Sequence, residues 1–151
     1  MKKKYENSLR EIIKEYNIKP KKKLGQNFLH DKNIISSIIN RADVEDEDII
    51  EIGPGPGILT ESMLKSKARS LLVIEKDNSF EANLKKIKNN YKDNFDYLIN
   101  DVIDFDFKTL TKKDYKFVSN LPYNISVPFI LKMIKIRRIV PWKEMILMVQ
   151  K

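Results

Sequence analysis

The sequence predicts an α/β fold built on a parallel β-sheet. Short apolar runs alternate with amphipathic segments of helical spacing along the chain. The second of these runs is continuously hydrophobic, as is typical of parallel strands that are covered on both faces. Strands that alternate with helices at this spacing indicate parallel pairing with right-handed crossovers. With 151 residues, no repeats and no low-complexity tracts, the chain is one domain at most.

Five strands are predicted. They are expected at residues 49–52, 71–74, 95–99, 115–119 and 145–149. The chain stops at or just past the fifth strand, and an α/β sheet that ends on an apolar strand without a covering helix has an unprotected edge. We therefore expect a fragment of a longer protein, truncated after about the fifth strand.

Helices are predicted before and between the strands. They are expected over residues 6–17, after Asp31, over residues 58–65, over residues 78–89 and from Ser126 onward. Asp31 is a good N-cap residue for the second of these helices. In the last helix, Pro128 is expected in the first turn, where proline is tolerated.

The composition excludes several classes of protein. With no cysteine and one histidine, His30, neither a disulfide framework nor a multi-histidine metal site is expected. The lack of cysteine is compatible with a reducing cytosol. No apolar run is long enough to span a membrane, and the basic start is not followed by the apolar stretch of a signal peptide.

The chain is basic, with a net charge of +8. Such a charge favours a polyanion such as rRNA as a partner, although a lysine-rich sequence can be basic whatever it binds. Lysines gather at residues 2–4 and 19–23. Residues 1–23 are therefore interpreted as a basic N-terminal helix and arm.

Polar residues and glycines lie at the carboxyl ends of the predicted strands, where ligands bind in α/β sheets. Gly53, Gly55 and Gly57 follow the first strand, so the backbone can approach a ligand closely beside a helix N-terminus that favours a carboxylate or phosphate. Glu75 ends the second strand and could accept two hydrogen bonds from ribose hydroxyls. Asp101 follows the third strand and could accept one from an adenine amino group. These residues predict a site for an adenosine-type cofactor.

Each feature has a plainer interpretation. The glycine run could be only a tight turn, Glu75 a solvated charge, and Asp101 one member of an acidic run with Asp104 and Asp106. A nicotinamide-binding Rossmann domain is a competing class, because Glu75 lies at the expected distance from the glycines. The third glycine of that fingerprint would fall at Ile58, however, and glycines at alternate positions fit an S-adenosylmethionine site better.

Asn120-Leu121-Pro122-Tyr123 follows the fourth predicted strand. The exocyclic amine of adenine is a poor nucleophile because its lone pair is delocalised into the ring. Two acceptors, the Asn120 side-chain oxygen and the Leu121 backbone oxygen, could draw that lone pair back onto nitrogen. Pro122 would stiffen the turn, and the Tyr123 ring would offer a face to a flipped base. The plainer interpretation is a strand-ending turn with a core tyrosine.

Four strings occur in a distinctive order along the chain. They are residues 24–29 (LGQNFL), residues 51–60 (EIGPGPGILT), Glu75 with Asp77, and residues 120–126 (NLPYNIS). In this order they resemble the rRNA adenine N6,N6-dimethyltransferases of the KsgA (RsmA) family, with the Erm methyltransferases as close relatives. The resemblance covers residues from about 20 to the end. The last string and the N-terminal arm are more similar to KsgA than to Erm.

The resemblance implies a Rossmann-like S-adenosylmethionine-dependent methyltransferase sheet, with residues 24–151 as an incomplete methyltransferase domain. It implies that catalysis depends on Asn120, Leu121, Pro122 and Tyr123. It implies a cofactor site that includes Asn27, Leu29, Gly53, Gly55, Glu75, Asp101 and Asn120. No metal is expected, because the sulfonium of the cofactor is already activated.

The resemblance also implies a substrate and a setting. The target would be two adjacent adenines in a hairpin loop near the 3′ end of 16S small-subunit rRNA, in a pre-30S particle during ribosome biogenesis. The protein would be a cytoplasmic monomer without a membrane partner. Family members continue into further strands and a helical domain that contributes to rRNA docking, so we expect cofactor binding by this chain and leave its turnover on rRNA open. A non-catalytic rRNA-binding assembly factor and a nicotinamide oxidoreductase are the alternatives.

Overall fold

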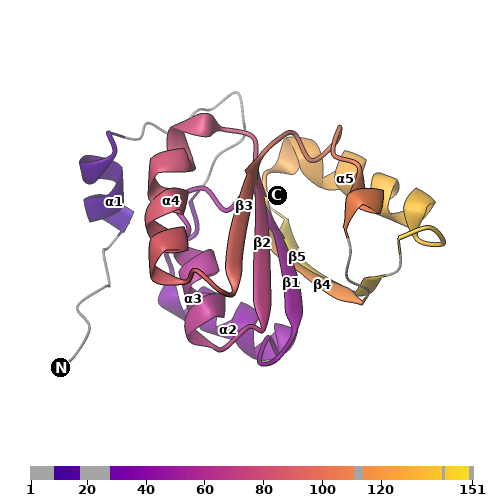
Figure 1. The fold of residues 1–151 in the computed structure, drawn as a ribbon, viewed down its shortest axis with the longest axis horizontal. Helices are drawn as coiled ribbons and strands as arrows, with labels where there is room; N and C mark the ends of the chain where they lie inside the picture. The colour runs from indigo at the N-terminus through magenta and orange to yellow at the C-terminus, as the bar shows by residue number, and fades with distance from the viewer. Residues whose placement is uncertain (1–8, 18–27, 111–113, 141, 150–151) are drawn as a thin grey trace.

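The computed structural model describes residues 9–17, 28–110, 114–140 and 142–149. These residues form three layers, with a β-sheet between helices on both of its faces (Figure 1). The five strands are all parallel and lie in the order β3-β2-β1-β4-β5. The predicted parallel α/β fold is confirmed. No helix in the described part of the chain is both long and apolar enough to cross a membrane.

Every predicted strand is present, and four of them are longer than expected. The strands are β1 (Asp48–Ile52), β2 (Ser70–Glu75), β3 (Phe95–Ile99), β4 (Tyr115–Leu121) and β5 (Trp142–Val149). β4 continues two residues beyond the predicted end, because Asn120 and Leu121 pair with Met148 and Val149 of β5. The tetrapeptide that was expected to follow this strand therefore begins inside it.

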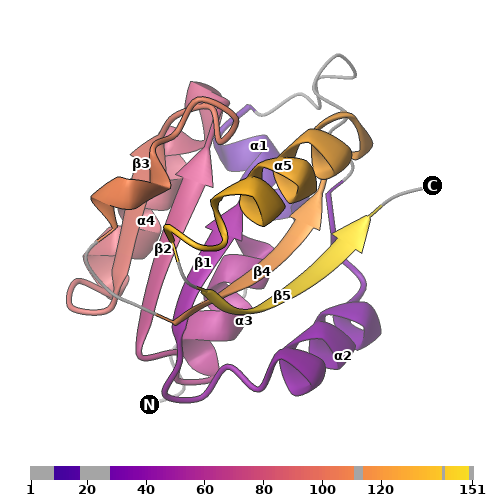
Figure 2. The ribbon, with the colours of Figure 1, turned by 90° about the vertical axis from the view of Figure 1, so that its right-hand side faces the viewer.

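The helices cover the two faces unequally. They are α1 (Leu9–Glu15), α2 (Lys32–Ala42), α3 (Ile58–Lys65), α4 (Glu81–Asn90) and α5 (Tyr123–Ile136), with short 3₁₀ turns η2 (Asn78–Phe80) and η3 (Phe107–Thr109). α2, α3 and α4 lie on one face, and α5 lies on the other (Figure 1). Figure 2 shows α5 in front of the sheet, with the strands side by side behind it. Residues 6–8 of the first predicted helix, the lysine runs at 2–4 and 19–23, and residues 24–27 lie outside the described residues.

Two predicted helix starts have different outcomes. Asp31 caps α2 as expected, because its Oδ1 accepts hydrogen bonds from the backbone N–H groups of Asn33 at 2.8 Å and Ile34 at 3.2 Å. The prediction that the last helix opens at Ser126 is wrong. α5 begins at Tyr123, where the carbonyl of Pro122 accepts from the Ser126 N–H at 3.2 Å, and Pro128 therefore lies inside the helix instead of in its first turn.

The core consists of two apolar clusters, one on each face of the sheet, because successive strand residues point to opposite faces. Ile49, Leu71, Val73 and Val118 pack toward α2, α3 and α4. The second cluster lies under α5. It contains Ile50, Ile52, Ile74, Phe117, Phe129 and Met133. Burial on both faces explains why these strands are continuously apolar in sequence.

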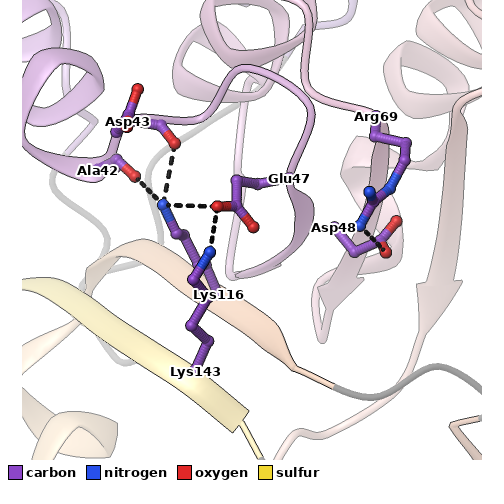
Figure 3. Close-up of polar contacts among 7 residues, drawn as sticks. All are labelled: Ala42, Asp43, Glu47, Asp48, Arg69, Lys116 and Lys143. Atoms are coloured by element: carbon purple, nitrogen blue, oxygen red, sulfur yellow. Dashed lines mark hydrogen bonds and ion pairs between the residues drawn. The ribbon is translucent and has the colours of Figure 1, made fainter.

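Charged residues close the sheet at the amino ends of the central strands (Figure 3). Lys116 of β4 is 4% exposed, and its ammonium donates to the carbonyls of Ala42 at 2.8 Å and Asp43 at 2.9 Å. It also lies 3.2 Å from a carboxylate oxygen of Glu47, to which Lys143 is bonded as well. The hydrogen bond from Lys143, followed by the one from Lys116, lowers the pKa of the Glu47 carboxyl. Lys116 thereby ties the C-terminal end of α2 to the sheet.

Candidate cofactor-binding site

A cleft opens at the carboxyl ends of β1, β2, β3 and β4. Its empty volume is about 930 Å³, counting the part open to solvent. β1 and β4 lie at the centre of the sheet order, where the chain crosses over in opposite directions, and such switch points are where α/β sheets bind ligands. The ladder between them includes Ile49 with Lys116 and Ile50 with Phe117. Nearer the cleft, the Ile52 N–H donates instead to the Ser119 hydroxyl at 2.8 Å.

The structure brings most of the predicted cofactor-binding residues to this cleft. Those that line it are Leu29, Gly53, Gly55, Glu75, Asp101 and Asn120. The remaining predicted residue, Asn27, lies outside the described residues. Residues that were predicted from four separate strand ends and a loop therefore share one cavity.

The glycine turn after β1 has a conformation that other residues adopt rarely. Gly53, Gly55 and Gly57 all have positive φ angles, of 64°, 53° and 78°. The positive φ of Gly57 favours glycine, and a Cβ atom added there would lie 2.6 Å from the Cδ1 atom of Ile87, which would have to move. A Cβ added at Gly53 would come within 3.9 Å of Pro122, which shows how closely the turns after β1 and β4 approach each other.

Glu75 organises the floor of the cleft. One of its carboxyl oxygens accepts from the Gly55 N–H at 3.0 Å, and the other accepts from the Asp77 N–H at 2.8 Å. Burial raises the pKa of Glu75, while these backbone hydrogen bonds oppose the rise. A carboxylate has about four acceptor positions, so Glu75 can hold the glycine turn and still accept from two ligand hydroxyls.

Asp101 faces the cleft from the end of β3. Its Oδ2 pairs with Lys76 Nζ at 2.5 Å, and its Oδ1 accepts from the Ile103 N–H at 2.9 Å. The hydrogen bond from Lys76 holds the pKa of Asp101 below its ordinary value. Asp104 and Asp106 are exposed and do not line the cleft, so the structure separates Asp101 from the rest of the acidic run.

The four residues from Asn120 to Tyr123 do not all face the cleft. Asn120 and Pro122 line it, as does Asn124 one turn into α5. The side chain of Leu121 is buried in the core cluster under α5. Tyr123 is 64% exposed and is not among the lining residues, so the interpretation of a core tyrosine is wrong.

Sequence reasoning missed two charged residues of the site. Lys76 lines the cleft as the partner of Asp101, and nothing in the sequence indicates that pairing. Glu51 also lines the cleft and is 2% exposed; Thr60 Oγ1 donates to its Oε2 at 2.6 Å. Burial raises the pKa of Glu51 to about 8. The available signal for Glu51 was a carboxyl group within an otherwise apolar strand.

Metal ligands do not gather in this part of the structure. Among the described residues, no group of three or more histidine, cysteine, aspartate and glutamate side chains could hold a metal ion. The site instead consists of backbone N–H groups, two buried carboxyl groups, one ion pair and a carboxamide. Such groups can bind an adenosine-containing ligand and orient a reacting group near Asn120.

This fold and cleft define a Rossmann-like α/β domain with a ligand site at the carboxyl edge of its sheet. A comparison with protein-family models matches residues 17–151 to the family described as ribosomal RNA adenine dimethylase. The chain therefore belongs to the ribosomal RNA adenine dimethylase family, in agreement with the resemblance seen in the sequence.

Individual relatives agree with this assignment. "Ribosomal RNA small subunit methyltransferase A" of Rhodopseudomonas palustris (strain TIE-1) is 37% identical over 142 residues, which cover 93% of this chain and 50% of the relative. A crystal structure of a dimethyladenosine transferase from Plasmodium falciparum is 30% identical with a TM-score of 0.67, over 83% of this chain and 44% of that one. The 23S rRNA methyltransferase ErmE is 22% identical with a TM-score of 0.67, over 82% of this chain and 48% of that one, and shows likeness of fold. The chain spans about half the length of the curated relatives it matches.

Proposed function

We propose that this chain forms the cofactor-binding part of an enzyme that methylates adenine N6 in small-subunit rRNA, with S-adenosylmethionine as the methyl donor. The observation that carries the proposal is the convergence of the glycine turn, Glu75, Asp101 and Asn120 on one cleft at the topological switch point. The names of the relatives supply the substrate class, because they describe small-subunit rRNA methyltransferases and a dimethyladenosine transferase.

The cleft offers a partner for each part of the cofactor. The N–H groups at the start of α3, beside the glycine turn, suit its carboxylate. Glu75 would accept from the ribose hydroxyls, and Asp101 from the adenine amino group. In this order, the reactive end of the ligand would lie near Asn120. Leu29 would add an apolar contact from the loop before α2.

S-adenosylmethionine supplies an activated methyl group on a sulfonium when it is bound. The contribution of the chain is to orient the target amine and to favour its lone pair on nitrogen. The side-chain oxygen of Asn120 and the backbone oxygen of Leu121 would accept the two amine hydrogens, and Pro122 would fix their direction. Electrostatic stabilisation of this kind is commonly the largest part of an enzymatic acceleration. The alkylated amine is acidic enough to lose its proton to water, so no strong general base is required.

The setting of the reaction is part of the same proposal. The substrate would be two adjacent adenines in a hairpin loop near the 3′ end of 16S rRNA, where unstacked bases cost little to extrude. The net charge of +8 supports an RNA partner. We place the protein, as a monomer, in the cytoplasm and in pre-30S assembly.

Calorimetric titration tests the first step of the proposal. The purified chain is titrated with S-adenosylmethionine and, separately, with a nicotinamide dinucleotide. We expect binding of S-adenosylmethionine and no heat of binding from the dinucleotide. Preferential binding of the dinucleotide would contradict the proposal and favour the oxidoreductase class.

A further inference from the structure

A lysine on α5 holds the backbone segment that carries Asp101. This segment runs from the end of β3 toward η3, and Lys132 projects onto it from the helix on the other side of the cleft. The Lys132 ammonium donates to the carbonyls of Ile103 at 2.6 Å, Phe105 at 2.6 Å and Val102 at 3.1 Å. One side chain therefore holds three carbonyl groups within residues 102–105, a segment that contains neither a strand nor an α-helix.

The same hydrogen bonds reach the carboxylate of Asp101. The peptide group between Val102 and Ile103 accepts from Lys132 at its oxygen and donates from its nitrogen to Asp101 Oδ1 at 2.9 Å. A peptide group that is hydrogen-bonded at both ends is polarised, which strengthens each bond. Lys76 holds the other oxygen of Asp101 at 2.5 Å. The direction of the carboxylate is thus set from two sides.

The surroundings of Lys132 show that its ammonium is committed to this loop. The side chain is half-buried, and its nitrogen lies 5.3 Å from the centre of the Phe107 ring. Phe107 in turn packs edge-on against Phe117 of β4, with ring centres 5.8 Å apart. Burial lowers the pKa of Lys132, while the charges of Asp104, Asp106 and Asp101 oppose that shift. The segment is therefore held both by Phe107, which packs against β4, and by the ammonium of Lys132.

We propose that Lys132 is a positioning residue for adenine recognition, which aims Asp101 into the cleft by fixing the backbone of residues 102–105. The inference rests on the proposed function, in which Asp101 accepts from the amino group of the cofactor. Lys132 also connects two sides of the cleft. The helix that carries it, α5, begins at the turn of Asn120 and Pro122, and its ammonium binds the segment that follows Asp101.

Ligand selectivity separates positioning from a purely structural role. S-adenosylhomocysteine carries the adenine amino group, and S-inosylhomocysteine, its deaminated counterpart, carries an oxygen that the Asp101 carboxylate would repel. K132M keeps most of the side-chain length and removes the ammonium. K135M, at an exposed lysine one turn further along α5, is the matched control. Both affinities are measured by calorimetry for the wild-type chain and for each variant.

The wild-type chain and K135M are expected to prefer S-adenosylhomocysteine strongly. K132M is expected to lose about tenfold in affinity for S-adenosylhomocysteine and much less for S-inosylhomocysteine, so that its selectivity falls. Should K132M fail to fold, K132Q gives the same readout, because its amide is one atom too short to reach all three carbonyls.

Two results would overturn the inference. One is a folded K132M or K132Q whose selectivity equals that of the wild-type chain. The other is a loss of thermal stability in both variants with the selectivity unchanged, which would assign Lys132 a structural role. If the wild-type chain binds neither compound, the proposed function itself fails, and that result is distinct from both of these.

Discussion

At the scale of single residues, the site depends on carboxyl groups whose properties are set by what surrounds them. Glu51 is almost fully buried with one hydrogen bond from Thr60, and its pKa rises to about 8. Asp101 is partly open to solvent and pairs with Lys76, which lowers its pKa. We therefore expect Glu51 to carry a proton at neutral pH and Asp101 to be an anion, ready to accept hydrogen bonds.

The proton on Glu51 makes stability depend on pH. The folded chain keeps this proton up to about pH 8, whereas an ordinary glutamate loses it near pH 4.5. Between these values the folded state binds more protons than the unfolded state, so the free energy of unfolding falls as the pH rises. E51Q has no carboxyl group at this position, so its free energy of unfolding lacks this pH dependence. Thermal unfolding of both proteins from pH 5 to pH 9 should show wild-type stability falling relative to E51Q; parallel curves would contradict the assignment.

Asn120 is the residue on which the chemistry depends most. Removing its carboxamide leaves the rest of the cleft intact, so N120A should bind S-adenosylmethionine with reduced but measurable affinity. Loss of an acceptor that orients the amine should lower methyl transfer by about 100-fold or more. The assay counts labelled methyl groups transferred to small ribosomal subunits, with N40A, at an exposed asparagine on α2, as the control. Transfer by N120A at the wild-type rate would disprove the role.

Single residues also show what a sequence can reveal about a site. The glycines, Glu75, Asp101 and Asn120 were predictable because each follows or ends an apolar run, and the carboxyl ends of parallel strands meet at one edge. The pairing of Lys76 with Asp101 was not predictable, because both side chains are polar residues at loop positions. The exposure of Tyr123 contradicts only the plainer interpretation of a core tyrosine, since a ring that offers a face to a base must be accessible.

At the scale of elements, boundaries were less predictable than the elements themselves. All five strands and the helices between them were expected from apolar patterns, whereas the last two residues of β4 were not. Those residues join the strand because β5 extends alongside them, and a long-range pairing of that kind has no local signal. The start of α5 was displaced for a related reason: Pro128 suggested a first turn, but Pro122 is the proline at the N-cap.

The junction of α2 with β4 is the element contact with the clearest energetic consequence. Lys116 satisfies two carbonyls at the end of α2 and pairs with Glu47 (Figure 3). K116M would leave these acceptors without their buried donor, so the free energy of unfolding should fall by about 3 kcal/mol. Chemical denaturation measures this loss. K92M, at an exposed lysine after α4, should change stability by less than about 0.5 kcal/mol.

A K116M protein as stable as the wild type would show that the ammonium does not hold α2 against the sheet. Because the cluster lies at the amino ends of the strands, away from the cleft, K116M should also keep its affinity for S-adenosylmethionine at temperatures where it is folded.

At the scale of the whole molecule, the two ends of the sheet have different roles. The amino ends of the central strands are closed by ion pairs of Lys116, Lys143 and Arg69 with acidic partners. The carboxyl ends open into the cleft at the switch point between β1 and β4. A parallel α/β sheet brings residues from distant parts of the sequence to one such edge, which is why so much of the site followed from the order of strands alone.

The central claim is that an adenosine-containing methyl donor binds across the carboxyl ends of β1, β2, β3 and β4. Titration of the isotopically labelled chain with S-adenosylmethionine, followed by amide chemical shifts, tests it most directly. We predict shifts that change at residues 53–57, 75–77, 100–103 and 120–125 and stay constant around Glu47, Arg69 and Lys116. Changes confined to the amino ends of the strands, or no saturable change at the glycine turn, would contradict the account.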